Sequence, residues 1–445
     1  MHENDRVTPP IRVLAQQMSE GRLSSVAFVK ACLRRIETTG SALHAFVRVY
    51  AESALQRAEA LDAERALKGV RGPLHGIPVA VKDLADVEGD VTGFGSRVYA
   101  TAPALRTAAF VRRLEDAGMI VIGKTQMVEF AFGSWGTNHA LGTPRNPHAA
   151  DRHFVPGGSS SGSAVAVAAG LVPAAIGTDT GGSVRIPAAL CGIVGLKTTI
   201  GAVSTDGVAP LSPTLDTIGP MTRYVDDARL IFGALRSTTE ASGRNGREAV
   251  RVRRVGRDAL EPLDEQVWSA YEDALERIAR LGLEVAPVTL PRSFADYQRD
   301  SGMIMAYEAY AALHRLVDDP ETPLDPFVRA RVMQGATISD ETMAAIRRER
   351  DVAIKAFGTV LPRGEILVLP TTPYPARPLA EVDESTFPMS RFTRIANHLD
   401  LCGLSIPCGR ADNGMPIGLQ LVAAGGAEHM LLTFAERLEE CADAA

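Results

Sequence analysis

The order of apolar and polar residues along the chain predicts helices that alternate with short buried strands. Helical spacing of apolar residues predicts helices at 24–37, 51–67, 107–117, 264–281, 301–357 and 427–442. Continuous short apolar runs predict buried strands at 79–83, 119–122, 283–288, 365–370 and 418–422. This alternation is typical of an α/β layer architecture. Because no linker or repeat divides the chain, we expect one large domain, with the polar residues 237–247 as a loop or minor boundary.

The composition is that of an ordinary globular protein of 445 residues, with 46% apolar and 22% charged residues. A net charge of −6 argues against a nucleic-acid partner, and the basic cluster at 251–254 is typical of a strand with one solvated face. The five cysteines are odd in number and include no CxxC pair, so they indicate neither a disulfide framework nor a zinc site. We therefore expect no metal and no cofactor.

The most apolar segment does not predict a membrane span. Residues 164–176 are too few to cross a bilayer, and they include Gly170 and Pro173. The N-terminus is polar, contains both acidic and basic residues, and has no apolar signal core. We expect no membrane partner and a location in the reducing cytoplasm.

One motif matches a known pattern but lacks the structural context that the pattern requires. Residues 118–125 (GMIVIGKT) have the GxxxxGK[ST] spacing of a phosphate-binding loop. That function needs a loop whose backbone amides surround a phosphate. Here the intervening residues are Met, Ile, Val and Ile, which predict the strand itself and place Lys124 at its end. We therefore reject nucleotide binding at this motif.

A run of Gly and Ser at 157–163 leads directly into the apolar residues 164–169. A flexible linker would not enter a core helix in this way, so we interpret the run as a tight turn that carries hydroxyls into the interior. Lys82 ends an apolar strand, and burial would lower its pKa far enough for it to act as a general base. A surface lysine is the ordinary alternative.

Ser183 follows Thr180, Gly181 and Gly182, a segment rich in accessible backbone amides. Such amides suit a serine nucleophile, because the oxyanion that develops on the substrate needs hydrogen-bond donors. A capped Gly-Gly turn is the ordinary alternative. Each candidate is therefore weak when it is taken alone.

Together these segments resemble the amidase signature family. The resemblance is carried by GGSSSGSAVAVAAGLVPAAIGTDTGGSVRIPAALCGIVGLK at 157–197, and by HGIPVAVKDL at 75–84, GKTQMVEFAFG at 123–133, LDTIGPMTR at 215–223 and MPIGLQLV at 415–422. It covers nearly the whole chain. It implies an α/β fold of one domain over 1–445, with a central mixed, twisted sheet covered by helices on both faces. Within it, the signature core would span 70–225 and a variable pocket region 240–400.

The resemblance also implies a catalytic triad. Lys82 would be the base, Ser159 a relay held in a cis peptide, and Ser183 the nucleophile that forms an acyl-enzyme. The oxyanion hole would be formed by Thr180, Gly181 and Gly182 together with Ser183. The reaction would be hydrolysis of the C–N bond of a carboxylic amide.

Three neighbours are expected to support this triad. Ser160 resembles a family serine that supports it by hydrogen bonds, although a simple turn role is an equal alternative. Arg185 is expected to pair with Asp179 and hold the loop, and a role in binding a substrate carboxylate stays open.

The substrate is less well defined by the sequence. In the family, the segment after the GKT strand helps to line the acyl pocket, and here it contains Met127, Phe130, Phe132 and Trp135. These side chains suit an aryl or alkyl acyl group, or they pack in the core. Because the same triad can attack other carbonyls, cleavage of esters or carbamates is a further hypothesis.

The alternative is the amidase subunit of a tRNA-dependent amidotransferase, a glutaminase that works with partner subunits. The stretch TDGVAPLSPTLDTIGP at 205–220 resembles stand-alone amidases instead. A scaffold without activity is disfavoured because all three triad residues are present. We expect a small-molecule amide substrate and a protein that is a monomer or a homodimer.

Overall fold

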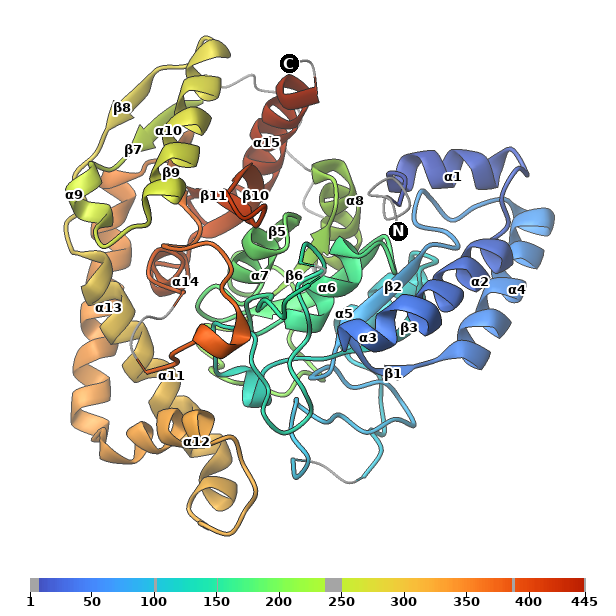
Figure 1. Ribbon diagram of the computed structural model, residues 1–445, viewed down its shortest axis with the longest axis horizontal. Helices are drawn as coiled ribbons and strands as arrows, with labels where there is room; N and C mark the ends of the chain where they lie inside the picture. The colour runs from blue at the N-terminus through green and yellow to red at the C-terminus, as the bar shows by residue number, and fades with distance from the viewer. Residues whose placement is uncertain (1–7, 100–101, 150, 237–249, 386–388, 444–445) are drawn as a thin grey trace.

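The computed structural model describes residues 8–99, 102–149, 151–236, 250–385 and 389–443. One sheet of eleven strands extends through these residues, in the order β1-β3-β2-β4-β6-β5-β10-β11-β9-β7-β8 (Figure 1). Parallel and antiparallel pairs both occur, and helices cover both faces. The predicted α/β fold with a mixed central sheet is therefore confirmed.

The strands are β1 Phe46–Val49, β2 Pro78–Lys82, β3 Ile120–Thr125, β4 Ala174–Asp179, β5 Val194–Lys197, β6 Thr217–Thr222, β7 Arg251–Arg254, β8 Val285–Pro287, β9 Glu365–Pro370, β10 Cys402–Arg410 and β11 Pro416–Ala423. The α-helices are α1 Ile11–Ser19, α2 Ser25–Arg35, α3 Ser41–Leu43, α4 Ala51–Lys68, α5 Ala109–Asp116, α6 Ser161–Ala168, α7 Arg185–Leu190, α8 Val225–Leu235, α9 Arg257–Leu260, α10 Glu265–Arg280, α11 Phe294–Val317, α12 Pro326–Met333, α13 Asp340–Val360, α14 Arg394–His398 and α15 Glu428–Asp443.

Strands with continuous apolar residues match the predictions, whereas strands rich in small or polar residues were missed. The missed strands are β1, β4, β5, β6 and β10, and the missed helices include α1, α7, α8 and α14. The predicted helical stretch 301–357 is divided between α11, α12 and α13. The predicted loop 237–247 lies outside the described residues.

Two sequence interpretations are confirmed by the strands. The residues of the rejected phosphate-binding motif form β3, and Lys124 lies buried in that strand. The basic cluster forms β7, where Arg253 and Arg254 make ion pairs with Glu365 and Glu272. Within the part of the chain that the structure describes, no helix combines the length and the apolar character needed to cross a membrane. A cytoplasmic location stays a prediction.

The centre of the sheet brings the candidate chemistry together. Strands β2 and β4 are parallel neighbours, with Val81 opposite Ile176, so their carboxyl ends meet at the same edge. Lys82 ends the first strand and Asp179 ends the second. In Figure 1, helices α6 and α7 lie over this central part of the sheet, between the N-terminal helices α1–α4 and the helices α9 and α10.

Helix α7 follows the loop that carries Ser183, and it lies unusually close to the sheet. Two glycines permit this approach. A Cβ atom at Gly195 would lie 2.6 Å from Cβ of Ala188, and one at Gly418 would lie 2.4 Å from Cβ of Ala189. Helices α8, α10 and α15 cover the opposite face, where their side chains surround Ile406 of β10.

We predict that Gly418→Ala destabilises the protein, because the added methyl group would force α7 away from the sheet. Overpacking of this kind costs about 1–3 kcal/mol in the free energy of unfolding. The control is Gly233→Ala in α8, where an added Cβ meets nothing within 4 Å and alanine improves helix propensity. Thermal unfolding should give a lower Tm for the first variant only, and equal Tm values would contradict the close approach.

Candidate active site

Lys82 is fully buried at the end of β2. Its Nζ atom donates hydrogen bonds to Ser159 Oγ at 2.7 Å and to Thr178 Oγ1 at 2.9 Å. Burial lowers the pKa of Lys82 to about 7, although the charges of Asp216 and Asp179 oppose this shift. A neutral amine near physiological pH can accept a proton, so the environment suits a general base.

Ser159 lies in the Gly/Ser turn, and the peptide bond between Gly158 and Ser159 is cis. The turn is attached to the segment that follows β3. The amide of Gly158 donates to the carbonyl of Ser134 at 2.9 Å, and the carbonyl of Ser159 accepts from the amide of Val128 at 3.2 Å. The interpretation as a tight turn that carries hydroxyls into the interior is therefore confirmed, since Ser159 is fully buried.

Ser160 supports the turn through backbone contacts. Its amide donates to the carbonyl of Ser183 at 3.2 Å, and its hydroxyl donates to the carbonyl of Thr178 at 3.3 Å. Ser160 therefore joins the Gly/Ser turn to β4 and to the loop that carries Ser183. These hydrogen bonds hold the backbone around the candidate triad.

The loop from Asp179 to Arg185 is organised by a buried ion pair. Asp179 and Arg185 are both fully buried, and their side chains meet at 2.8 Å. Burial alone would raise the pKa of Asp179, but the charge and the hydrogen bonds of Arg185 outweigh it and hold this pKa below its usual range. Arg185 also donates to the carbonyl of Thr393 and to the side chain of Asn397, so it braces the loop and does not line the pocket.

One member of the expected oxyanion hole is already engaged. The amide of Gly182 donates to Asp179 Oδ1 at 2.8 Å, which corrects its assignment as a donor toward the substrate. The reason is that Gly182 has a φ of 128°, a backbone conformation that favours glycine and turns its amide toward the carboxylate. The amides of Thr180, Gly181 and Ser183 remain as candidates.

Asp216 was not singled out from the sequence, although it lies within the quoted segment LDTIGPMTR. The hydroxyl of Thr180 donates to Asp216 Oδ1 at 2.5 Å, and the amides of Leu211 and Ser212 donate to Oδ2 at 3.0 Å. Burial raises the pKa of Asp216 to about 6, and these hydrogen bonds limit the rise. Asp216 therefore holds Thr180 at the start of the loop that carries Ser183.

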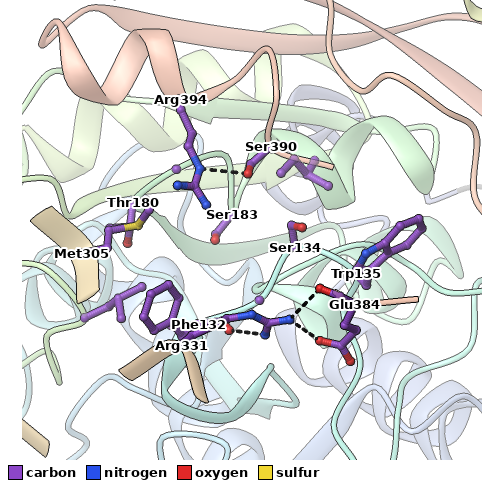
Figure 2. A pocket seen from close by; sticks show the side chains of 15 residues that line it. Phe132, Ser134, Trp135, Thr180, Ser183, Met305, Arg331, Glu384, Ser390 and Arg394 are labelled. Carbon is purple, nitrogen blue, oxygen red and sulfur yellow. Dashed lines mark hydrogen bonds and ion pairs between the residues drawn. The ribbon is translucent and has the colours of Figure 1, made fainter. Parts of the chain in front are cut away.

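A pocket opens beside Ser183, whose side chain is the least buried of the candidate triad (Figure 2). Its wall includes Phe132 and Trp135, as the sequence suggested, and residues from the variable region that were not predicted. The latter are Met305, Arg331, Glu384, Ser390 and Arg394.

Met127 and Phe130 are not in the pocket wall, which corrects the predicted lining. Both are fully buried in a hydrophobic cluster, where the ring of Phe130 lies 5.6 Å from that of Phe94. Phe130 and Ala131 have φ values of 52° and 57°, so the chain reverses here. The reversal sends Phe130 into the core and Phe132 toward the pocket, which simple spacing does not reveal.

The profile of the Amidase family matches residues 27–432 of this chain. The chain belongs to the amidase family. A crystal structure of an amidase superposes with a TM-score of 0.88 and 33% identity over 97% of this chain and 99% of that chain. The native peptide amidase from Stenotrophomonas maltophilia superposes with a TM-score of 0.81 and 30% identity over 98% of this chain and 97% of that chain.

Two curated relatives show the range of this amidase family. One, from Symbiobacterium thermophilum, is a subunit of the glutamyl-tRNA(Gln) amidotransferase and is 36% identical over 461 residues, 93% of each chain. A 2-amino-5-chloromuconic acid deaminase from Comamonas testosteroni is 36% identical over 443 residues, 96% of this chain and 94% of the relative. The protein is thus an amidase-family hydrolase that acts on C–N bonds, and its relatives include both single enzymes and one component of an amidotransferase.

We predict that the activity of this amidase rises with pH through the pKa of Lys82. Below about pH 7 the amine is protonated and cannot accept a proton, so kcat/KM for a neutral amide should fall about tenfold per pH unit. Above about pH 8 the amine is neutral, and kcat/KM should become constant.

The Lys82→Arg variant tests the assignment, because a guanidinium stays charged. It should lose about 10²- to 10⁴-fold in kcat/KM at pH 8. A rate that is unchanged between pH 5 and pH 8 in the natural protein would contradict the role of a neutral Lys82. Circular dichroism spectra of the natural protein and the variant check that both are folded.

Proposed function

We propose that this protein is a stand-alone amidase that hydrolyses a small carboxylic amide through an acyl-enzyme on Ser183. The observation that supports this proposal most directly is the buried hydrogen bond of 2.7 Å between Lys82 Nζ and Ser159 Oγ. It joins a lysine whose pKa is lowered to about 7 to a hydroxyl in the turn that contacts the backbone of Ser183.

In the proposed reaction, neutral Lys82 takes the proton of Ser159, and Ser159 takes the proton of Ser183 as Ser183 Oγ bonds to the carbonyl carbon. The amides of Thr180, Gly181 and Ser183 are the candidate donors to the oxyanion. The proton then returns through Ser159 to the leaving nitrogen, and the C–N bond breaks. Water, deprotonated along the same relay, hydrolyses the ester and releases the acid.

The pocket supports an acyl group with a hydrocarbon part. Phe132, Trp135 and Met305 provide apolar surface beside Ser183. An aryl or alkyl group would lie against these side chains. The same nucleophile would also attack an ester or a carbamate of matching shape, because the relay is not specific for the leaving atom.

We predict that Ser183→Ala lowers kcat for an amide by at least about 10³-fold, because the nucleophile is absent. With an activated aryl ester, mass spectrometry of the quenched natural protein should show an added acyl group on the peptide that contains Ser183. The Ser183→Ala variant should show none.

Ser161 offers a matched control for the serines of the turn. It is buried in the same Gly/Ser segment, and among the described residues its hydroxyl hydrogen-bonds only to the carbonyl of Gln126, at 3.5 Å. Ser161→Ala should keep most of the rate, whereas Ser159→Ala should lose about 10²- to 10⁴-fold. Equal losses for both variants would contradict a relay through Ser159.

A second candidate function is the amidase subunit of a tRNA-dependent amidotransferase. It is favoured by curated relatives with that name, of which the Symbiobacterium thermophilum protein is 36% identical over 93% of this chain. Against it stands the segment at 205–220, which resembles stand-alone amidases.

We predict that the purified chain alone hydrolyses small amides with a rate proportional to its concentration. Affinity purification from the natural host, followed by mass spectrometry, should recover no stoichiometric partner chain. Activity that is limited to glutamine and that requires a co-purified partner and charged tRNA would replace the first proposal with the second.

A further inference from the structure

We propose that the substrate carries a free carboxylate, which Arg394 binds beside the scissile amide. This inference rests on the proposed function, and it names the class of substrate as a short monoamide of a dicarboxylic acid. The evidence for it is the position, the contacts and the charge of Arg394, a residue that is neither Arg185 nor a member of the candidate triad.

Arg394 reaches the pocket from the first residue of α14, and its head group points toward Ser183 in Figure 2. Two of its nitrogens are engaged with neutral acceptors. Nε donates to Ser390 Oγ at 2.9 Å, and Nη1 donates to the carbonyl of Gln298 at 2.9 Å. These contacts hold the guanidinium in one place, and Nη2 makes no hydrogen bond to any described residue.

The charge of Arg394 has no counter-ion within the described part of the chain. No carboxylate there lies within 4.0 Å of its nitrogens. A guanidinium stays protonated in proteins, and a charge that is partly withdrawn from water, as in the half-buried Arg394, is stabilised by a partner of opposite sign. An anionic ligand would supply that partner.

Arg331, the second arginine of the pocket, differs from Arg394 because it has a counter-ion. Arg331 Nη2 forms an ion pair of 2.7 Å with Glu384, and its Nη1 donates to the carbonyl of Phe132 at 2.8 Å. The pocket therefore holds two guanidinium groups and one carboxylate, a positive balance. Burial and the charge of Arg331 lower the pKa of Arg394 to about 10, which reflects the same lack of an anion.

The position of Arg394 limits the length of the substrate. A Cβ atom built on Gly181 would lie 3.6 Å from Arg394 Nε, so the guanidinium lies directly beside the loop that carries Ser183. The preceding residue, Thr393, donates its hydroxyl to the carbonyl of Gly181 at 2.6 Å and fixes this arrangement. A carboxylate on Arg394 can therefore be separated from the reacting carbonyl by only a short chain.

Trp135 offers a further donor for such a ligand. It lines the pocket with 3% of its surface exposed, and its buried Nε1 has no hydrogen-bond partner in the described residues. The apolar residues Phe132 and Met305 would contact the methylene groups between the two ends of the substrate.

The reaction stays the amide hydrolysis proposed above: the monoamide and water give the dicarboxylic acid and ammonia.

The test compares succinamate and glutaramate with levulinamide, a neutral amide in which a methyl group replaces one carboxylate oxygen of succinamate. At pH 8 we expect kcat/KM to be about 10- to 100-fold higher for at least one of the anionic amides, as a charge-assisted hydrogen bond provides. In Arg394→Gln this ratio should fall toward unity, and Arg394→Lys should keep part of it because the charge remains.

Arg391→Gln is the matched control. Arg391 lies in the same segment, outside the pocket wall, and its Nη2 donates to the carbonyl of Glu261. This variant should keep the preference for the anionic amides. A preference that is equal in Arg394→Gln and in the natural protein would overturn the inference.

Binding is measured separately from turnover in the Ser183→Ala protein by isothermal titration calorimetry. Tighter binding of succinamate or glutaramate than of levulinamide, lost when Arg394→Gln is added, supports the inference even if no amide is hydrolysed. In that case only the proposed function fails. Turnover of levulinamide at the same rate as the anionic amides, without any preference in binding, overturns the inference and leaves the proposed function standing.

Discussion

The buried ion pair between Asp179 and Arg185 is the interaction on which the geometry of this site depends. Asp179 ends a central strand and accepts from backbone amides of the following loop, while Arg185 starts α7 and reaches the backbone of Thr393. A buried pair is favourable only when its remaining hydrogen-bonding groups are satisfied, and here Asn397 and Gln420 complete it. The strand, the loop that carries Ser183 and the segment that bears Arg394 are thereby held in one arrangement.

The site contains two cationic side chains, the buried Lys82 and the half-buried Arg394, whose chemistry differs in a useful way. Lys82 can lose its proton, and burial lowers its pKa to about 7, so it can exchange a proton with Ser159. Arg394 keeps its charge under all ordinary conditions, because a guanidinium does not deprotonate in proteins. The first residue type suits proton transfer, and the second suits recognition of an anion. An exchange of the two residues would serve neither purpose.

The two halves of the chain contribute different parts of the site. The strands and turns between residues 78 and 222 supply the lysine, the serines and the loop amides, and the sheet register places them together. The region after residue 290 supplies Met305, Arg331, Glu384 and Arg394, which shape and charge the pocket. The family is shared by proteins named for quite different substrates, which agrees with a common reaction centre and a variable pocket.

The amino-acid sequence was enough to predict the fold class, the family and the three residues of the candidate triad, because their neighbours Gly, Ala and Val form a long, specific pattern around them. Helices and apolar strands such as β9 follow from local periodicity, whereas β6 and β10 both contain Gly and Pro and are strands only because their neighbours pair with them. The folded chain was needed to show which aromatic residues face the pocket, since two left-handed residues reverse the chain at Phe130. It was also needed for the charge of the pocket: Arg331 meets Glu384 while Arg394 meets no acid among the described residues, and such pairings depend on contacts between segments far apart in the chain.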